Sequence, residues 1–220
     1  PYTTLFRSII TDGLVLALDA ANSKSYIGSG ATWYDMSGGA YNSTLQGSPT
    51  FSSSNLGYFG LNGSSQYATI TAAGASVAAS GSVTQEAFIY ANSLTGTIFC
   101  RGQSGTSFNY GMILGTTLNF RNTNGDFAVT SNLSTGRWYH LAIATDASGS
   151  TGYVNGVKQN TVLNTTTTNS INEICIARRS TNSATEYFNG SLSLIRIYHR
   201  LLTAVDILQN FNATRGRYGI

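Results

Sequence analysis

The chain alternates short runs of β-branched, aromatic and aliphatic residues with clusters of Gly, Asn, Asp and Ser. Apolar runs of about four to eight residues between turn-forming clusters are typical of β-strands. The pattern predicts strands over residues 14–18, 58–61, 67–70, 83–90, 97–101, 110–114, 117–121, 127–130, 138–145, 151–154, 158–163, 173–177 and 187–198. So many strands are unusual for one barrel and natural for two stacked sheets. We therefore expect an all-β fold, a two-sheet antiparallel jelly-roll sandwich.

Strict alternation along the last predicted strand assigns its side chains to two faces. It places Leu192, Leu194 and Arg196 on one face, and Ile195 and Ile197 on the other. The Ser-rich stretch 47–55, in contrast, is interpreted as a surface loop.

Turn and capping residues in the sequence predict one hairpin and one helix. Asn155-Gly156 lies between two apolar runs, and this pair readily adopts the positive φ angles of a type I′ turn. Near the end of the chain, Thr203 is a candidate N-cap with Asp206 three residues later. We expect the C-terminal helix, with its apolar stripe of Ile207, Leu208 and Phe211, to pack on one edge or end of the sandwich.

Composition excludes several classes of protein. Charged residues make up only 10% of the 220 residues, which argues against a coiled coil or a helical bundle. The net charge is +3, and four Arg gather near the C-terminus (Arg196, Arg200, Arg215 and Arg217). This is too sparse for a nucleic-acid face, so we interpret them as solubilising charge and expect no nucleic-acid partner. No apolar run approaches the length of a membrane span, so we expect no membrane insertion.

The first eight residues resemble a translated laboratory sequence. Pro1–Ser8 (PYTTLFRS) matches, codon for codon, a translation of the end of a widely used short-read sequencing adapter. We expect 1–8 to be a sequencing artefact and 9–220 to form a single domain. The chain does not begin with Met, so its natural N-terminus and any preceding domain stay open.

Several segments resemble a known family. Residues 137–146 (RWYHLAIATD) and 152–156 (GYVNG) are similar to the Trp-x-His strand and Tyr-Val-Asn-Gly hairpin of laminin-G-like domains of the concanavalin A-like superfamily. Residues 188–200 (FNGSLSLIRIYHR), followed by the helix at Thr203, resemble its closing strand and helix. The resemblance implies a concanavalin A-like sandwich with one C-terminal helix, a fold that hosts many activities.

The two ends of the chain resemble a narrower subgroup. Residues 14–22 (LVLALDAAN), 32–38 (TWYDMSG) and 209–219 (QNFNATRGRYG) are similar to members found in bacteriophage structural and tail-associated proteins. This implies a phage particle as the setting, on the virion surface or in another extracellular place. Glycans or a host cell surface, and other virion proteins, are then the expected partners.

Catalytic signatures are absent from the sequence. Glucanases of this fold carry Glu-x-Asp-x-Glu, which puts two carboxyl groups on one face of a strand. Glu86, Glu173 and Glu186 each lack another acid within four positions, and we interpret Glu86 as a solvent-facing strand residue. His140 and His199 have no nucleophile motif beside them. We therefore expect no enzyme.

Relatives of this fold commonly bind calcium at the rim of the sandwich, which makes Ca²⁺ the one cofactor to consider. Asp19, Asn22 and Asp35 are the candidate ligands, because carboxylate and amide oxygens suit a hard cation. The alternative is turn chemistry, in which the same side chains accept hydrogen bonds from nearby backbone amides.

Sugar recognition needs exposed aromatic faces beside amide and hydroxyl groups, and the chain holds 13 Tyr. Candidates near Gly-rich turns are Tyr26, Trp33, Tyr34, Tyr41 and Tyr110, each of which has core packing as its alternative. Trp138 is expected to pack in the core.

Cys100 and Cys175 lie in predicted strands, either as two buried thiols or as a disulfide between neighbouring strands. The sequence as a whole predicts a non-catalytic binding or adhesion module for glycans or cell surfaces on a phage particle. The alternatives are a purely structural virion module in a capsid decoration or tail, and a bacterial surface adhesion domain.

Overall fold

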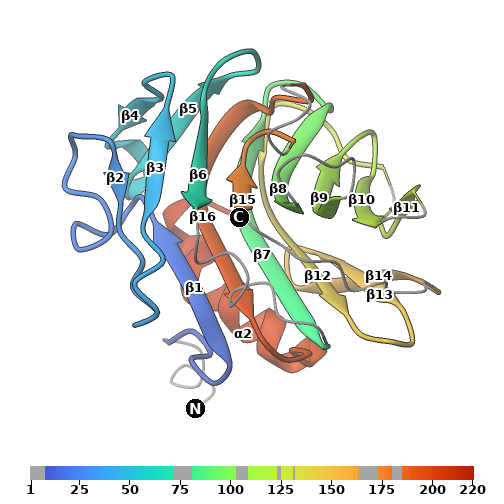
Figure 1. Ribbon diagram of the computed structural model, residues 1–220. Helices are drawn as coiled ribbons and strands as arrows, with labels where there is room; N and C mark the ends of the chain where they lie inside the picture. Colours follow the sequence, from blue (N-terminus) through green and yellow to red (C-terminus); the bar gives the residue numbers. More distant parts are fainter. Residues whose placement is uncertain are drawn as a thin grey trace.

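The computed structural model of the chain describes residues 8–71, 81–102, 109–122, 125–130, 132–163, 173–179 and 185–220. Its strands form two antiparallel sheets of eight, which we name sheet A and sheet B (Figure 1). The expected all-β sandwich with one C-terminal helix is confirmed. The adapter-like residues 1–7 and the side chain of Tyr110 lie outside the described part of the chain.

Sheet A has the order β14-β13-β12-β7-β16-β5-β4, with β1 pairing to β16 beside this path. Its strands are β1 (Leu14–Asp19), β4 (Thr50–Ser52), β5 (Tyr58–Asn62), β7 (Val83–Ala91), β12 (Trp138–Thr145), β13 (Ser150–Val154), β14 (Val157–Val162) and β16 (Asn189–Tyr198). Sheet B has the order β11-β10-β9-β8-β15-β6-β3-β2. Its strands are β2 (Thr32–Trp33), β3 (Ser43–Gln46), β6 (Tyr67–Thr71), β8 (Gly96–Gly102), β9 (Asn109–Leu114), β10 (Leu118–Asn122), β11 (Gly125–Ala128) and β15 (Glu173–Ile176).

The main core lies between the two sheets. Alternate side chains from both inner faces form one buried cluster, including Leu16, Ile89 and Ile195 from sheet A and Phe99 and Phe120 from sheet B. Burial of apolar area of this kind is the main force that holds the two sheets together.

The outer face of sheet A is covered by the C-terminal segment. Helix α2 (Ala204–Thr214) and the short 3₁₀ helix η2 (Arg215–Arg217) lie against it, and Figure 1 shows α2 beside the sheet that contains β1, β16 and β7. Phe88, Trp138, Phe211 and Tyr218 form a second buried cluster there, with the rings of Trp138 and Tyr218 4.5 Å apart. Sheet A is therefore buried on both faces where the helix covers it.

Helix α2 begins where the sequence predicts. The side chain of Thr203 accepts a hydrogen bond from the backbone N–H of Asp206, and the carboxylate of Asp206 accepts one from the backbone N–H of Thr203. This capping box satisfies two backbone donors that the helix itself leaves free. Of the predicted apolar stripe, Ile207 and Phe211 are buried, whereas Leu208 is 38% exposed.

The predicted hairpin at Asn155-Gly156 joins β13 to β14, with φ angles of 50° and 77°. Every predicted strand, from the first at 14–18 to the last at 187–198, is found in the structure. The ends of the strands differ from the prediction by up to two residues. In the opening part, the structure adds β2, β3 and β4, and a 3₁₀ helix η1 (Ser54–Leu56). The interpretation of 47–55 as a loop is wrong in part, because β4 lies within it and pairs with β5.

Strict alternation along β16 is also wrong in part. The pairing of β16 with β7 contains a β-bulge between Leu192 and Leu194. As a result, Leu192 points into the main core, whereas Leu194 points to the outer face of sheet A with Phe88. A bulge inserts an extra residue into one strand, so the alternation changes phase at that point.

Candidate functional site

A cavity of about 410 Å³ opens on the outer side of sheet A, next to the beginning of α2. One wall comes from β12, β13, β14 and the turn between β12 and β13, and the other from Leu201, Leu202 and Thr203. A cavity of this size falls in the range that holds small ligands. Thr151, Thr161, Ser148 and Thr203 contribute hydroxyl groups to it, and Asp146 contributes a carboxylate.

The strand wall combines an aromatic ring with hydroxyl groups. Tyr153 on β13 is 5% exposed and packs with Ala142, Ala144 and Leu202. Burial raises the pKa of its phenol, so the hydroxyl stays protonated at neutral pH.

Two further hydroxyls line the same wall. The Oγ1 atoms of Thr151 and Thr161 lie 2.8 Å apart on the paired strands β13 and β14. The regular hairpin thus presents donors and acceptors at fixed positions.

Asp146 is fixed by its own turn. Its Oδ1 accepts hydrogen bonds from the backbone N–H groups of Ser148 (2.7 Å) and Gly149 (3.1 Å). Asp in this position is typical of an Asx turn. Within the described part of the chain, Oδ2 accepts no hydrogen bond, so this oxygen can accept one from a ligand hydroxyl.

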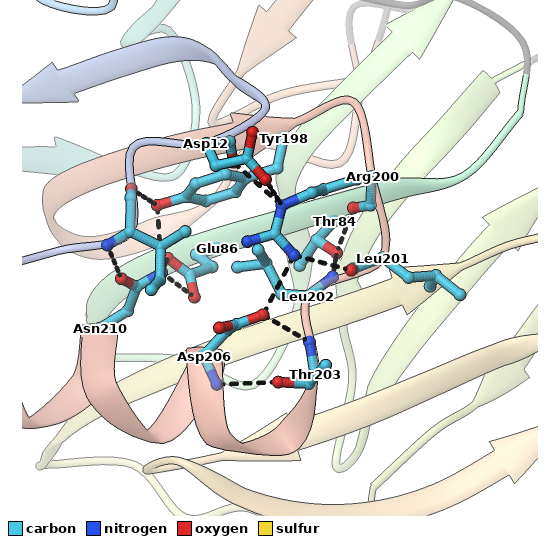
Figure 2. Close-up of polar contacts among 11 residues, drawn as sticks. Asp12, Thr84, Glu86, Tyr198, Arg200, Leu201, Leu202, Thr203, Asp206 and Asn210 are labelled. Carbon is cyan, nitrogen blue, oxygen red and sulfur yellow. Dashed lines mark hydrogen bonds and ion pairs between the residues drawn. The ribbon is translucent and has the colours of Figure 1, made fainter.

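The opposite wall is held by a hydrogen-bond network that Figure 2 shows. Arg200 bonds to the carboxylates of Asp12 and Asp206, both at 3.0 Å. The hydroxyl of Thr84 on β7 donates to the carbonyl of Arg200 and accepts from the N–H of Leu202. Thr84 thereby fixes the segment from Arg200 to Leu202 against sheet A, and the capping box fixes Thr203.

A buried charge lies beneath α2, also in Figure 2. Both carboxylate oxygens of Glu86 lie 3.0 Å from Nδ2 of Asn210, as Figure 2 shows. Oε2 of Glu86 lies 3.7 Å from Nη1 of Arg196. Nε2 of His140 lies 3.6 Å from Oε1. Burial acts to raise the pKa of Glu86, but His140, Arg196 and Asn210 together outweigh it and hold that pKa below its ordinary value.

Two interpretations of charged residues are therefore corrected. Glu86 is not a solvent-facing strand residue, because the C-terminal helix covers the outer face of β7. Of the four C-terminal arginines, Arg196 is buried beside Glu86, Arg200 bonds to two carboxylates and Arg217 pairs with Asp19. Arg215 lies with its guanidinium 5.5 Å from the ring centre of Phe211.

The predicted aromatic candidates lie in different environments. Tyr26 and Trp33 are in the core, each in edge contact with Phe59, so their faces are not free for a ligand. Tyr41 is half-buried against the same core. Tyr34 is 41% exposed and stays a candidate for ligand contact.

The predicted calcium ligands are engaged by neighbouring groups. Nη1 of Arg217 lies 2.9 and 2.7 Å from the two carboxylate oxygens of Asp19, and Oδ1 also accepts from the N–H of Ala21. Asn22 accepts from the N–H of Lys24. Attraction to Asp19 raises the pKa of Arg217 in spite of burial, which acts to lower it.

Asp35 is engaged in the same way. Its Oδ1 accepts from the N–H groups of Ala17 and Ser37, and its Oδ2 from the hydroxyl of Ser37 and the N–H of Tyr41. These contacts favour the turn-chemistry alternative for the three candidates. Among the described residues, no group of three or more His, Cys, Asp or Glu is arranged to hold a metal ion.

A second polar cluster lies over sheet B. Arg121 on β10 forms a two-pronged ion pair with Asp126 at 2.6 Å and bonds to Glu186, which also accepts from Arg179 and from the hydroxyl of Thr97. Since these charges already pair with each other, the cluster offers less free hydrogen-bonding capacity than the cavity.

Sequence reasoning missed the cavity, although it contained a signal. Asp146-Ala147-Ser148-Gly149 is a polar turn between two predicted strands, followed by Thr151 and Tyr153 at alternate positions. That pattern identifies a hairpin with hydroxyls on one face. It does not reveal that Leu201 and Thr203 close the opposite side.

Comparisons with known proteins agree with this architecture. The model of the Laminin_G_3 family, described as "Concanavalin A-like lectin/glucanases superfamily", matches residues 62–208, more than half of the chain. No curated protein sequence matches.

None of the helices in the described ranges is long and apolar enough to cross a membrane.

Solved structures share the fold at low sequence identity. Domain 4 of a GH43 extracellular arabinanase from Geobacillus stearothermophilus, in complex with arabinotriose, is 16% identical with a TM-score of 0.67, covering 90% of this chain and 97% of that one. A Trypanosoma rangeli sialidase mutant that displays trans-sialidase activity is 16% identical with a TM-score of 0.68, covering 97% of this chain and 35% of that one. The binding domain of Paraclostridial Mosquitocidal Protein 1 is 16% identical with a TM-score of 0.68, covering 92% of this chain and 52% of that one.

Proposed function

Because the chain belongs to the Laminin_G_3 family of the concanavalin A-like lectin/glucanase superfamily, we propose that it is a glycan-binding module whose sugar site is the cavity beside α2. The observation that carries this proposal is the lining of the cavity. It combines the exposed apolar side chains of Leu163 and Leu201 with four hydroxyl groups and the carboxylate of Asp146. An apolar surface beside fixed hydrogen-bonding groups is suited to hold a sugar ring.

The charge of the lining indicates neutral glycans. Among the described residues, Asp146 is the one charged residue that lines the cavity. A carboxylate accepts charge-assisted hydrogen bonds from sugar hydroxyls and repels sialic or uronic acids. Lys158 pairs with Tyr153 across the hairpin but does not line the cavity. The preferred ligand is therefore a neutral sugar.

The proposed module binds without catalysis. Hydrolysis of a glycosidic bond ordinarily needs two carboxyl groups on either side of the bond. In the described part of the chain, Asp146 is the only residue with a carboxyl group that lines the cavity. Glu86 is buried beneath α2, and Glu186 is bonded to arginines. We accordingly expect glycan binding with no release of reducing sugar.

The experiment is a glycan array with the protein displayed multivalently, because single-site affinities of lectins are weak. Arabinotriose is included as a probe, since the arabinanase domain of the same fold was solved with it. The test variant is Ser148→Trp, which fills the cavity from an exposed position. The control is Ala147→Trp, an exposed neighbour that does not line the cavity.

We expect Ser148→Trp to weaken binding by at least about tenfold, or about 1.4 kcal/mol. Ala147→Trp should bind like the wild type, and both variants should unfold at the wild-type temperature. Equal binding by the two variants would move the sugar site away from the cavity. In that case Tyr34→Ala tests the exposed aromatic residue of the opening segment.

Calcium is tested in the same assay with and without chelator. Loss of binding in chelator would support the predicted site at Asp19, Asn22 and Asp35. Binding that persists in chelator agrees with the contacts these side chains already make.

We further propose that the module is displayed on a phage particle, on the virion surface, where it meets glycans of a host cell. The resemblance of residues 14–22, 32–38 and 209–219 to phage structural proteins supports this setting. Tail or capsid genes beside the coding sequence would support it, and genes for bacterial surface proteins would favour a bacterial adhesion domain.

A purely structural virion module is the second candidate. Val205 and Leu208 on α2, and Val157 on β14, are exposed apolar side chains on neighbouring elements. Such side chains favour contact with another protein. A folded protein that binds no glycan but self-associates through these residues would support this alternative.

A further inference from the structure

Cys100 and Cys175 lie directly opposite each other in sheet B. Cys100 is on β8 and Cys175 on β15, and the two residues are partners in the antiparallel ladder between these strands. Both side chains are fully buried, and no disulfide joins them in the structure. The chain contains no other cysteine.

We propose that Cys100 and Cys175 form a cross-strand disulfide when the chain folds in an oxidising environment. Directly opposed residues of antiparallel strands have Cα atoms about 4.5–5.5 Å apart. Disulfides span Cα distances of about 4.4–6.8 Å. The ladder therefore places the two thiols within reach without any movement of the strands along each other.

Small neighbours leave room for the bond. The ladder partner of Cys100 on its other side is Gly111, and that of Cys175 is Thr69. Gly111 has no side chain to displace the sulfur of Cys100. The side chains of Phe99 and Ile176, also ladder partners, point to the main core instead, so the bond would form on the other face of sheet B.

The oxidant is a small-molecule disulfide such as oxidised glutathione. One thiolate attacks a glutathione sulfur, which gives a mixed disulfide and releases one glutathione thiolate. The second cysteine thiolate then attacks the mixed disulfide and releases the other. The two protons from the cysteines end on the two glutathione thiols, and the two cysteines are oxidised while one glutathione disulfide is reduced.

Oxidation must occur during folding rather than after it. Thiolate is the reacting species, and burial, assisted by Glu173 and Cys100, raises the pKa of the Cys175 thiol in the native protein. Neither sulfur is exposed to a soluble oxidant. Once formed, the bond has the same protection against reductants.

The test is oxidative refolding of the full chain. The protein is reduced and unfolded, diluted into a mixture of reduced and oxidised glutathione, quenched with acid, and treated with a maleimide in denaturant. Intact mass then counts free thiols and bound glutathione. Cys175→Ser is the matched control, because it leaves no second cysteine with which the remaining thiol could form a disulfide.

For the wild type, we expect a folded product two hydrogens lighter than the reduced chain, with neither maleimide nor glutathione attached. Proteolysis without reduction should yield a peptide that joins Cys100 to Cys175. The Cys175→Ser protein should carry one maleimide or one glutathione. A folded wild type that carries two such groups would overturn the proposal.

Expression with export to a bacterial periplasm gives the same readout if refolding in vitro is inefficient. There, oxidation accompanies folding, and the intact mass again distinguishes a disulfide from two thiols. Because the readout is a mass, it is independent of any ligand.

Discussion

Glu86 shows how strongly one buried charge depends on its partners. Its carboxylate is surrounded by Asn210, Arg196 and His140 under the C-terminal helix. Replacing Glu86 by Ala leaves Arg196 buried without its carboxylate, which typically costs about 3–5 kcal/mol. Urea unfolding measures the loss. The control is Glu186→Ala, which breaks partly exposed ion pairs and should cost at most about 1 kcal/mol.

The same residue should affect stability at low pH. The pKa of Glu86 is below its ordinary value of about 4.5, and that of Asp206 is also lowered, because bonds from Thr203 and Arg200 outweigh the effect of burial. A lowered pKa in the folded protein stabilises it above the ordinary pKa, and this stabilisation is lost as the pH falls through the folded value. The free energy of unfolding should therefore be steady near neutral pH and decrease below about pH 4.5.

The matched variant for this pH dependence is Glu86→Gln. It has no carboxylate to titrate, so its free energy of unfolding should fall less steeply on acidification. Parallel curves for the variant and the wild type would assign the acid sensitivity to other groups.

Single residues also show where sequence reasoning stops. Glu86 lies in an alternating strand, and alternation alone says that its side chain faces away from the main core. Whether that side is water or another layer depends on α2, more than a hundred residues later in the chain. The burial of Tyr26 and Trp33 against Phe59 is likewise a tertiary contact that their Gly-rich surroundings do not reveal.

Among the elements, the β13–β14 hairpin is linked to α2 through Gly156. Gly156 has a φ of 77°, and a Cβ atom there would lie 2.9 Å from Cδ1 of Leu208 and 3.1 Å from Phe211. Gly156→Ala should therefore suffer both backbone strain and displacement of the helix. Gly38→Ala is the control, because Gly38 has a φ of 94° with nothing within 4 Å of the added atom.

We expect Gly38→Ala to cost about 1–2 kcal/mol from strain alone, and Gly156→Ala to cost more. Thermal unfolding of both variants measures the difference. Equal losses would mean that the helix moves aside without cost, and that the hairpin and helix are only loosely connected.

The predictability of elements follows the strength of local signals. The long apolar strands β7, β12 and β16 and the capped helix α2 were predictable, because each has a regular pattern with turn residues at its ends. The short strands β2, β3 and β4 were not, because two to four residues are too few to show a period. The bulge in β16 was hidden for a different reason, since it depends on pairing with β7.

For the molecule as a whole, the sandwich was predictable and its cavity was not. The fold follows from many strands and from family motifs that extend over most of the chain. The cavity is formed by residues 144–163 and 201–203, which are distant in sequence and are joined only because Thr84 and the capping box hold the helix start against sheet A. Its hydroxyl groups have no special motif that marks them before folding.

The C-terminal cover of sheet A has a practical consequence for where this domain can be cut. The family match ends at residue 208, before Phe211, Arg217 and Tyr218. Yet Tyr218 packs on Trp138, and Arg217 pairs with Asp19 at the end of β1. Recombinant fragments that follow the limits 62–208 lack β1 to β4 and all of β5 except Asn62, and they leave an aromatic surface uncovered. We expect them to aggregate in size-exclusion chromatography, whereas residues 9–220 elute as a folded species.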